Sequence, residues 1–232
     1  MTAIAVAVSG ALCRLLDGPS EVEAENAAEI DAVWRAAHAD KPETFNGRIL
    51  LAEAVELDGD VLRADFRECA FATLLWLRGQ RASPPPLYNV FGAAAVLSRD
   101  GAFLLGRMAP HTSNAGQIYF PCGTPDPGDA AEGLVDLEGS IARELCEETG
   151  LAAPLVHPTP RSVAVFDAHL VGFVRRFDSD LDAAALEAQA RAHLAQEARP
   201  ELDGVVMARD PAALGDATRT FVRMAMGALL GD

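Results

Sequence analysis

Three glutamates, Glu144, Glu147 and Glu148, are spaced so that a helix would carry them on one face. Neighbouring carboxylates on a helix face repel each other and destabilise an isolated helix by roughly a few tenths of a kcal/mol per pair. A hard divalent cation reverses that effect, because Mg²⁺ takes oxygen ligands and combines carboxylates with water and substrate phosphate. The spacing alone therefore leaves two interpretations open, a divalent-metal site or a solvated acidic face in an acidic protein.

The residues around these glutamates extend the pattern. The segment Arg143–Leu151 (RELCEETGL) resembles the second half of the signature box of the Nudix hydrolases, and every specified position of that half is filled. Upstream, Gly123 is followed after five residues by Asp129, at the position where the family has Glu. Thirteen residues, 130–142, separate Asp129 from the arginine, whereas the family has seven. The chain thus resembles a Nudix hydrolase with a divergent box and a loop that is six residues longer.

This resemblance implies a metal-dependent reaction at a diphosphate bond. Glu144, Glu147 and Glu148 would be ligands of Mg²⁺ or Mn²⁺, and Glu147 is also taken as catalytic. Arg143 would hold the glutamates or the loop in place through its planar set of donors. A water molecule, activated by the metal or by a carboxylate base, would attack one phosphorus in line. The cysteines would have no catalytic part.

The inserted loop affects one position of the box. Asp129 is expected to fill the place of the usual Glu, and three other acidic residues are alternatives: Glu132, Asp136 and Glu138. Family members often recruit a further carboxylate, as ligand or as general base, from a loop after the box. Glu201, just before the expected strand 202–208, is the first choice for that catalytic role and Glu197 the second.

Three residues are expected to contact substrate: Arg107 at the end of a predicted strand, Gln117 in a polar loop, and Gly123 at the start of the box. The segment Gly116–Pro121 resembles the end of a motif found in coenzyme A diphosphatases, although Thr112 and Cys122 differ from that motif. Coenzyme A diphosphatase activity is therefore one alternative function. A Nudix-fold binding or regulatory module without catalysis is the other.

The N-terminal third resembles another subgroup. Trp34, Pro42 and the segment Phe45-Asn46-Gly47 are similar to the N-terminal region of Nudix proteins that hydrolyse UDP-sugars. This similarity favours a nucleoside diphosphate linked to another moiety as the substrate. The function predicted from the sequence is thus hydrolysis of the diphosphate linkage in such a small nucleotide.

Hydrophobic periodicity and turn residues predict an α/β fold. We expect a Nudix-like α/β/α sandwich with a mixed sheet over 87–232, which contains the similar stretch 91–214, and an N-terminal α+β extension over 1–83. The boundary is expected at Ser83–Pro86, where three prolines stop helix and interior strand. Predicted helices are Asn26–Asp40, Cys69–Leu77, Leu137–Glu148, Leu181–Ala198 and Ala217–Leu230. Predicted strands are 1–10, Arg48–Val55, Asp60–Phe66, Val90–Leu97, Ala102–Arg107, Ser162–Val174 and Gly204–Ala208.

Composition narrows the possible partners. The formal net charge is −15, which disfavours nonspecific nucleic-acid binding because that binding requires neutralised phosphates. No apolar run reaches the roughly 18 residues of a membrane span. The four cysteines form no metal-binding spacing, which indicates reduced thiols in a cytoplasmic protein. A homodimer is possible, since dimers are the commonest soluble oligomers.

Overall fold

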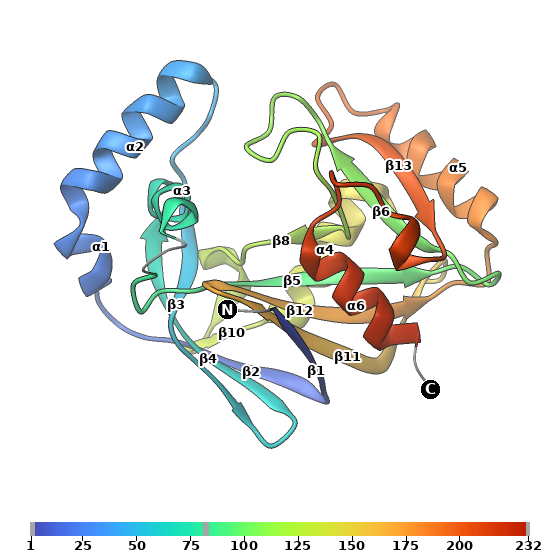
Figure 1. Ribbon diagram of the computed structural model, residues 1–232, viewed down its shortest axis with the longest axis horizontal. Coiled ribbons are helices and arrows are strands. Elements are labelled where there is room, and N and C mark those ends of the chain that lie inside the picture. The colour runs from blue at the N-terminus through green and yellow to red at the C-terminus, as the bar shows by residue number, and fades with distance from the viewer. Residues whose placement is uncertain (1–2, 81–83, 231–232) are drawn as a thin grey trace.

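The strands of the chain form two mixed β-sheets, which six helices cover (Figure 1). This architecture comes from a computed structural model, which describes residues 3–80 and 84–230. The larger sheet has eight strands in the order β1-β11-β12-β5-β6-β13, with β7 paired to β6 and β8 paired to β5. Its strands are β1 (Ile4–Val8), β5 (Asn89–Leu97), β6 (Phe103–Met108), β7 (Ile118–Tyr119), β8 (Cys122–Gly123), β11 (His157–Asp167), β12 (Leu170–Asp178) and β13 (Leu202–Ala208).

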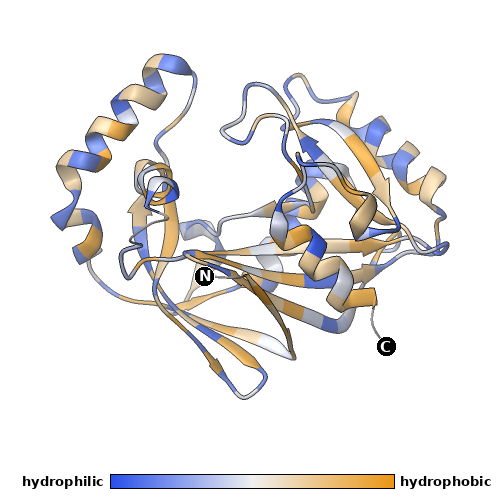
Figure 2. Cartoon of the chain, in the orientation of Figure 1, coloured by the Kyte–Doolittle hydropathy of each residue, from blue (hydrophilic) through white to orange (hydrophobic). Residues whose placement is uncertain are grey.

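The larger sheet is the middle layer of a sandwich. Strand β5 runs parallel to β12, and alternate β5 side chains point to opposite faces. On one face β5 packs with α4 (Leu137–Thr149) and α5 (Ala183–Leu194), and on the other with α6 (Thr220–Leu230). Figure 2 shows the apolar residues concentrated in these strands and on the helix faces beside them. The predicted α/β/α sandwich with a mixed sheet is confirmed.

The centre of the larger sheet is open at one end. Strands β5 and β6 pair with each other only at Leu97 and Phe103. Beyond that point β8 pairs with β5 and β7 pairs with β6, so residues 118–123 lie between the diverging strands. Helix α4 crosses β5 at Gly92, where an added Cβ would come within 3.0 Å of the Ile141 side chain. This close approach brings α4 next to the open end.

The N-terminal extension contains the smaller sheet and three helices. The sheet order is β3-β4-β2-β10-β9, and Gly59, with φ of 63°, lies in the turn between the antiparallel strands β3 and β4. Helices α2 and α3 pack together and on β3 through a separate apolar cluster. The elements are β2 (Gly10–Leu15), α1 (Glu21–Glu25), α2 (Ala27–Asp40), β3 (Arg48–Asp58), β4 (Val61–Ala70), α3 (Phe71–Gly79), β9 (Ala130–Ala131) and β10 (Leu134–Val135).

The extension and the sandwich exchange strands. Strand β1, from the start of the extension, pairs with β11 at the edge of the larger sheet. Strands β9 and β10, from the inserted loop of the box, join the smaller sheet by pairing β10 with β2. The insertion therefore builds a short hairpin that connects the two parts of the chain. It contains part of the additional residues between Asp129 and Arg143.

Most predicted elements are present, but several differ in their bounds; the helix predicted over Ala217–Leu230, for example, begins at Thr220. The single strand Ser162–Val174 is wrong, because Ala168, with φ of 53°, makes a turn that divides the segment into β11 and β12. The helix at 181–198 is shorter, since Asp182 caps its start and Leu194 ends it. The helix at Cys69 begins at Phe71, because β4 continues to Ala70. Residues 1–2 of the predicted first strand and Ser83 of the predicted boundary lie outside the described residues.

Within residues 3–80 and 84–230, every helix is too short or too polar to cross a membrane.

Candidate active site

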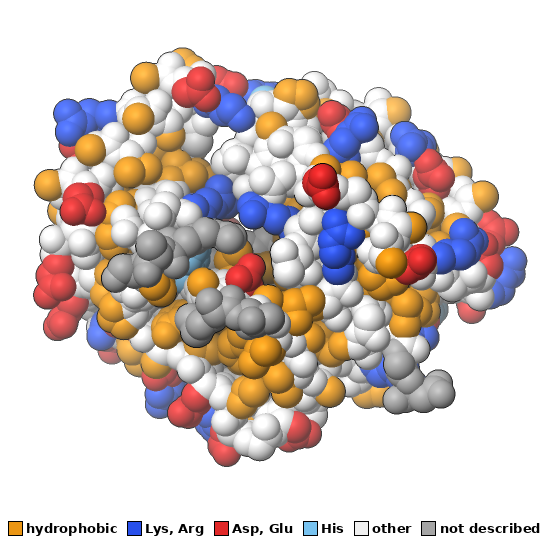
Figure 3. All heavy atoms as spheres, in the orientation of Figure 1, with side chains coloured by type: hydrophobic (Ala, Val, Ile, Leu, Met, Phe, Trp, Pro, Cys, Tyr) orange, Lys and Arg blue, Asp and Glu red, His pale blue; other side chains and the backbone are white. Residues whose placement is uncertain are grey.

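A pocket of about 580 Å³ lies where the larger sheet opens, within the size range of small-molecule sites. Helix α4 and the splayed strands form one side, and α3 with the segment around Glu43 forms the other. The pocket is thus shared between the extension and the sandwich. On the face in Figure 3, basic side chains gather around the hollow between these two parts.

Four carboxylates line this pocket. Glu43 lies on the side of the extension and pairs with Arg199 at 3.1 Å, whereas Glu144 and Glu148 come from α4 and Glu201 from the loop before β13. Glu148 is 7% exposed, and its Oε2 accepts a hydrogen bond from the Cys122 N–H at 3.1 Å. Burial raises the pKa of Glu148 well above its usual value, and the charges of Glu144 and Glu201 raise it further. The ionised form of Glu148 is therefore unfavourable in this site, and a bound cation would stabilise it.

Glu144 has the same electrostatic character. Burial is the largest cause that raises its pKa to about 7, opposed by Arg143 and reinforced by Glu147 and Glu201. Gly123 lies directly against this side chain, and an added Cβ would come within 3.0 Å of the Glu144 carboxyl group. Only glycine leaves room for the carboxylate at this point of the pocket.

Glu147 lies outside the pocket. Its side chain is 60% exposed, and Arg143 Nη1 lies 3.2 Å from its Oε2. A helix turns by about 100° per residue, so Glu147 and Glu148 project about 100° apart. The pocket-facing stripe of α4 is narrow enough to include Glu144 and Glu148 only. The expected convergence of three box glutamates is replaced by two of them together with Glu201.

Arg143 and Asp129 form a pair beside the pocket. Arg143 Nη2 donates to Asp129 Oδ2 at 2.9 Å and to Oδ1 at 3.1 Å. The Asp129 side chain, 7% exposed, also accepts from Ser140 Oγ and from the Asp126 N–H, each at 3.0 Å. Asp129 does not line the pocket. Its contacts make it a residue that positions Arg143 and the start of α4.

The three alternatives to Asp129 have other roles. Asp136 caps the first turn of α4 through the Gly139 N–H at 2.8 Å. Glu138 is paired with Arg175, and Glu132 occupies a turn with φ of 52°. None of the three lines the pocket. Asp129 is therefore the acidic residue of this loop that contacts the box arginine.

The fit to a metal follows from the donor set. Carboxylate oxygens are the ligands that Mg²⁺ and Mn²⁺ prefer. In the part of the chain that the structure describes, no three His, Cys, Asp or Glu side chains form a ready-made cluster of ligands. Glu144 and Glu148, whose pKa values are raised, nevertheless provide oxygen donors whose ionised forms a bound cation would stabilise. These donors suit a hard divalent ion that keeps several waters.

A comparison with models of protein families identifies the family of the chain. The model of the NUDIX domain matches residues 88–216, more than half of the chain. The chain belongs to the Nudix family. The matched range contains Glu144, Glu148 and Glu201, the Arg143–Asp129 pair and the inserted hairpin.

Solved Nudix structures resemble parts of the chain. A Nudix hydrolase from M. smegmatis, RenU, is 15% identical, with a TM-score of 0.35, over 55% of this chain and 76% of that one. A MutT protein from Methanosarcina mazei Go1 is 25% identical, with a TM-score of 0.29, over 40% and 64%. An Ap4A hydrolase from C. elegans is 12% identical, with a TM-score of 0.34, over 51% and 79%. A search of curated proteins finds no match.

Within this Nudix domain, two of the predicted substrate contacts lie away from the pocket. Arg107 Nε donates to Asp203 Oδ1 at 2.6 Å, and its side chain is half exposed. The next residue, Met108, lines the pocket, and because side chains alternate along a strand, Arg107 points to the other face. Gln117 is also absent from the pocket lining, whereas Gly123 is part of it. Glu197 is paired with His193 at 2.9 Å.

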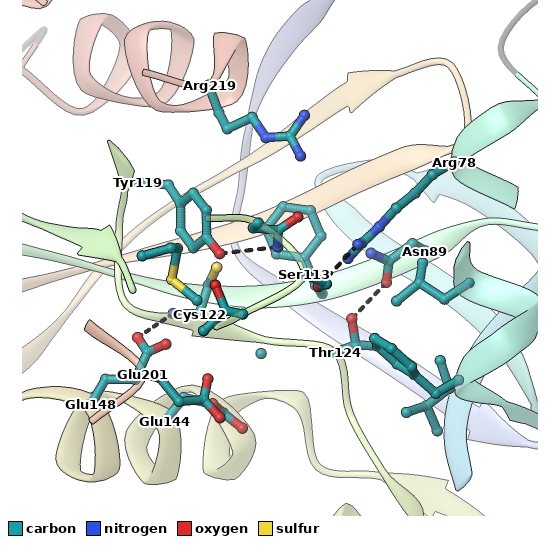
Figure 4. Close-up of a pocket in the computed structure, with 18 of the residues that line it drawn as sticks. Arg78, Asn89, Ser113, Tyr119, Cys122, Thr124, Glu144, Glu148, Glu201 and Arg219 are labelled. Carbon is teal, nitrogen blue, oxygen red and sulfur yellow. Dashed lines mark hydrogen bonds between the residues drawn. The ribbon is translucent and has the colours of Figure 1, made fainter. Parts of the chain in front are cut away.

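Several pocket residues of this Nudix protein were missed by the sequence analysis. Arg78, in the last turn of α3, and Arg219, directly before α6, reach into the pocket (Figure 4). Asn89 and Thr124 also line it and share a hydrogen bond of 3.0 Å. No local spacing marks these residues, because their elements meet only in the folded chain.

Proposed function

We propose that this Nudix protein hydrolyses the diphosphate linkage of a nucleoside diphosphate joined to another moiety, with Mg²⁺ or Mn²⁺ as cofactor. The observation that carries the proposal is the buried Glu148 and the partly buried Glu144 of α4, which face Glu201 inside a pocket of nucleotide size. The net charge of −15 favours a small nucleotide over a nucleic acid as the partner.

Glu144 and Glu148 are the proposed metal ligands, with Glu201 completing the acidic wall. A bound divalent ion would neutralise the diphosphate oxygens and orient the leaving phosphate. Glu147 is exposed and contacts Arg143, so the proposed role for it is to support Arg143 at the helix surface. The metal would thus be held by oxygen atoms from α4 and from the loop before β13.

Glu201 is the proposed general base, because it approaches the pocket from an element other than α4. Its carboxylate would hold a water molecule and accept a proton as the water oxygen bonds to one phosphorus. The bond from that phosphorus to the bridging oxygen breaks, and the electron pair leaves with the second phosphate. The products are two phosphorylated fragments. No covalent enzyme intermediate is needed.

The supporting residues preorganise this arrangement. The Cys122 N–H fixes one oxygen of Glu148, and Arg143, held by Asp129, contacts Glu144 Oε1 at 2.9 Å. The absence of a side chain at Gly123 leaves space for Glu144. Catalytic groups held in this way lose little free energy to reorganisation when the reaction proceeds.

The apolar part of the pocket supports a nucleoside as one end of the substrate. Phe91 and Phe221 both line it and meet edge to face, with ring centroids 5.1 Å apart. Aromatic rings of this kind provide a flat apolar surface on which a base is able to pack. The surface lies on the same sheet face as α6, so it is independent of the acidic wall on α4.

A product assay tests the proposal. The full chain is incubated with UDP-sugars, ADP-ribose, dinucleotides, coenzyme A and nucleoside triphosphates, each with Mg²⁺ and with EDTA. We expect metal-dependent release of two phosphorylated products from at least one diphosphate-linked nucleotide. Saturable nucleotide binding without turnover under any of these conditions would instead identify a binding module.

A further inference from the structure

Two arginines of the pocket lie outside the residues that match the Nudix model. Arg78 belongs to α3 of the extension, and Arg219 follows the matched range 88–216. In Figure 4 both guanidinium groups enter the pocket on the side away from Glu144 and Glu148. The proposed hydrolysis uses neither arginine, so their presence inside the pocket calls for a separate explanation.

The surroundings of Arg78 leave most of its donors for a ligand. A guanidinium group carries five N–H donors in a planar fork. Within residues 3–80 and 84–230, the Arg78 side chain makes one hydrogen bond, from Nη1 to Ser113 Oγ at 3.2 Å, and no carboxylate pairs with it. Burial lowers the pKa of Arg78, and the neighbouring charge of Arg219 lowers it further. A largely buried cation beside a second cation is unfavourable unless negative charge is supplied.

Tyr119 is the pocket group whose negative form would stabilise the Arg78 charge. The neighbouring Tyr119 has its phenol pKa raised, chiefly by burial, and so stays neutral. Its hydroxyl accepts a hydrogen bond from Asn114 Nδ2 at 3.1 Å. The pocket therefore has an acidic end suited to a metal and a basic end suited to an anion.

We propose that Arg78 and Arg219 form an anion-binding subsite that holds a phosphoryl or carboxylate group of the substrate. Planar guanidinium groups bind both kinds of anion through paired, charge-assisted hydrogen bonds. The inference deepens the proposed function, on which it rests for the identity of the ligand as a substrate. It also gives the extension a direct part in choosing the substrate, because Arg78 comes from α3.

The anion has two possible sources. One is the diphosphate itself, and the other is a second charged group on the moiety joined to it. Both sources share the chemistry that Arg78 recognises, and matched substrates separate them.

The first experiment measures binding without catalysis. Inorganic phosphate is titrated by calorimetry into the full chain in EDTA, where the acidic end repels anions and the basic end remains. We expect saturable binding to the wild type, and binding weakened at least about tenfold in Arg78→Gln. Arg35→Gln is the matched control, because Arg35 is 71% exposed on α2 and pairs with Asp31 outside the pocket. Its phosphate affinity should equal that of the wild type.

Arg78→Lys guards against a folding defect. It keeps the charge but lacks the planar fork, so we expect weaker binding than the wild type and stronger binding than Arg78→Gln. Circular dichroism and thermal melting show whether each variant folds. The proposed subsite is overturned if the folded Arg78→Gln variant binds phosphate as tightly as the wild type does. It is equally overturned if the wild type binds no phosphate.

The second experiment uses pairs of substrates that differ in one anionic group. Coenzyme A is compared with 3′-dephospho-coenzyme A, and UDP-glucuronate with UDP-glucose, each with Mg²⁺. If Arg78→Gln lowers kcat/KM at least about tenfold more for the anionic member of a pair, the subsite binds the second group. Equal losses for both members assign it to the diphosphate, and unchanged values contradict it. If the wild type hydrolyses none of the diphosphate-linked nucleotides of the product assay, the proposed function fails while the phosphate titration still decides the subsite.

Discussion

Asp129 holds Arg143 by two hydrogen bonds from one terminal nitrogen, at 2.9 and 3.1 Å, while the other terminal nitrogen contacts Glu144 and Glu147. The turn Pro127–Asp129, directly before the inserted hairpin, is thereby joined to α4. The aspartate at this position of the box is therefore part of the support for the acidic wall, although it never reaches the pocket.

Replacing Asp129 should weaken both stability and catalysis. Asp129→Asn removes the charge opposite Arg143, which should lower the free energy of unfolding by about 1.5–3 kcal/mol. The lower end is expected because the Arg143 side chain is 35% exposed. Urea unfolding and steady-state kinetics check this, and we expect kcat to fall more than KM rises. Asp129→Glu, which restores the charge, should recover most of the activity; a variant that stays as impaired as Asp129→Asn would contradict a positioning role.

Glu144 and Glu148 should contribute most to metal binding and to metal-dependent activity. Mutation of residues that only support metal ligands typically lowers metal affinity or activity by about 10–100-fold. Glu144 and Glu148 are proposed as ligands themselves, so Glu144→Gln and Glu148→Gln should each lower kcat/KM by more than about a hundredfold. Glu187→Gln serves as the control, because Glu187 pairs with Arg191 on the surface of α5. Mn²⁺ titration followed by electron paramagnetic resonance should show weaker binding in the first two variants only. Unchanged Mn²⁺ affinity in both would refute their assignment as ligands.

Without metal, the stability of the protein should fall as pH rises. The pKa of Glu144 is raised from 4.5 in the unfolded chain to about 7 in the folded one, chiefly by burial. The folded state therefore binds more protons than the unfolded state between these values, and its stability is lost as pH rises from about 4.5 to about 7. The linked loss is on the order of 3 kcal/mol.

Chemical denaturation across this pH range in EDTA measures the effect. Glu144→Gln should flatten the profile, because glutamine does not titrate. Mg²⁺ should flatten it as well, since a bound cation favours the ionised form. A wild-type profile that rises with pH over the same interval would show that burial does not raise the pKa of Glu144.

Gly123 should tolerate no side chain. In Gly123→Ala the new methyl group would meet the Glu144 carboxyl group at less than 3.0 Å, so that side chain must move. We expect a loss of about 1–3 kcal/mol in stability or a displaced carboxylate with at least tenfold lower activity. Gly10→Ala is the matched control, because nothing lies within 4 Å of its added Cβ. Equal activity and melting temperature in the two variants would rule out the close approach.

Local patterns in the sequence determined the elements that carry the box. The apolar spacing and the Gly150 stop predicted α4, and the structure ends this helix at Gly150 with φ of 69°. Glu144 and Glu148 lie on one helical face because they are four residues apart and an α-helix has 3.6 residues per turn. Glu147 shows the limit of that argument, since which part of the face meets the pocket depends on how the helix is rotated against β5.

Only the tertiary structure decided which distant residues meet. Arg78 lies in α3, Arg219 lies directly before α6, and Glu201 precedes β13 at the edge of the larger sheet, yet all three line one pocket. Arg107 points away from the pocket because successive side chains of a strand point to opposite faces, and the next residue, Met108, lines the pocket. Secondary structure follows from interactions among near neighbours in the chain. The pocket follows from packing between elements far apart in it, which no local spacing records.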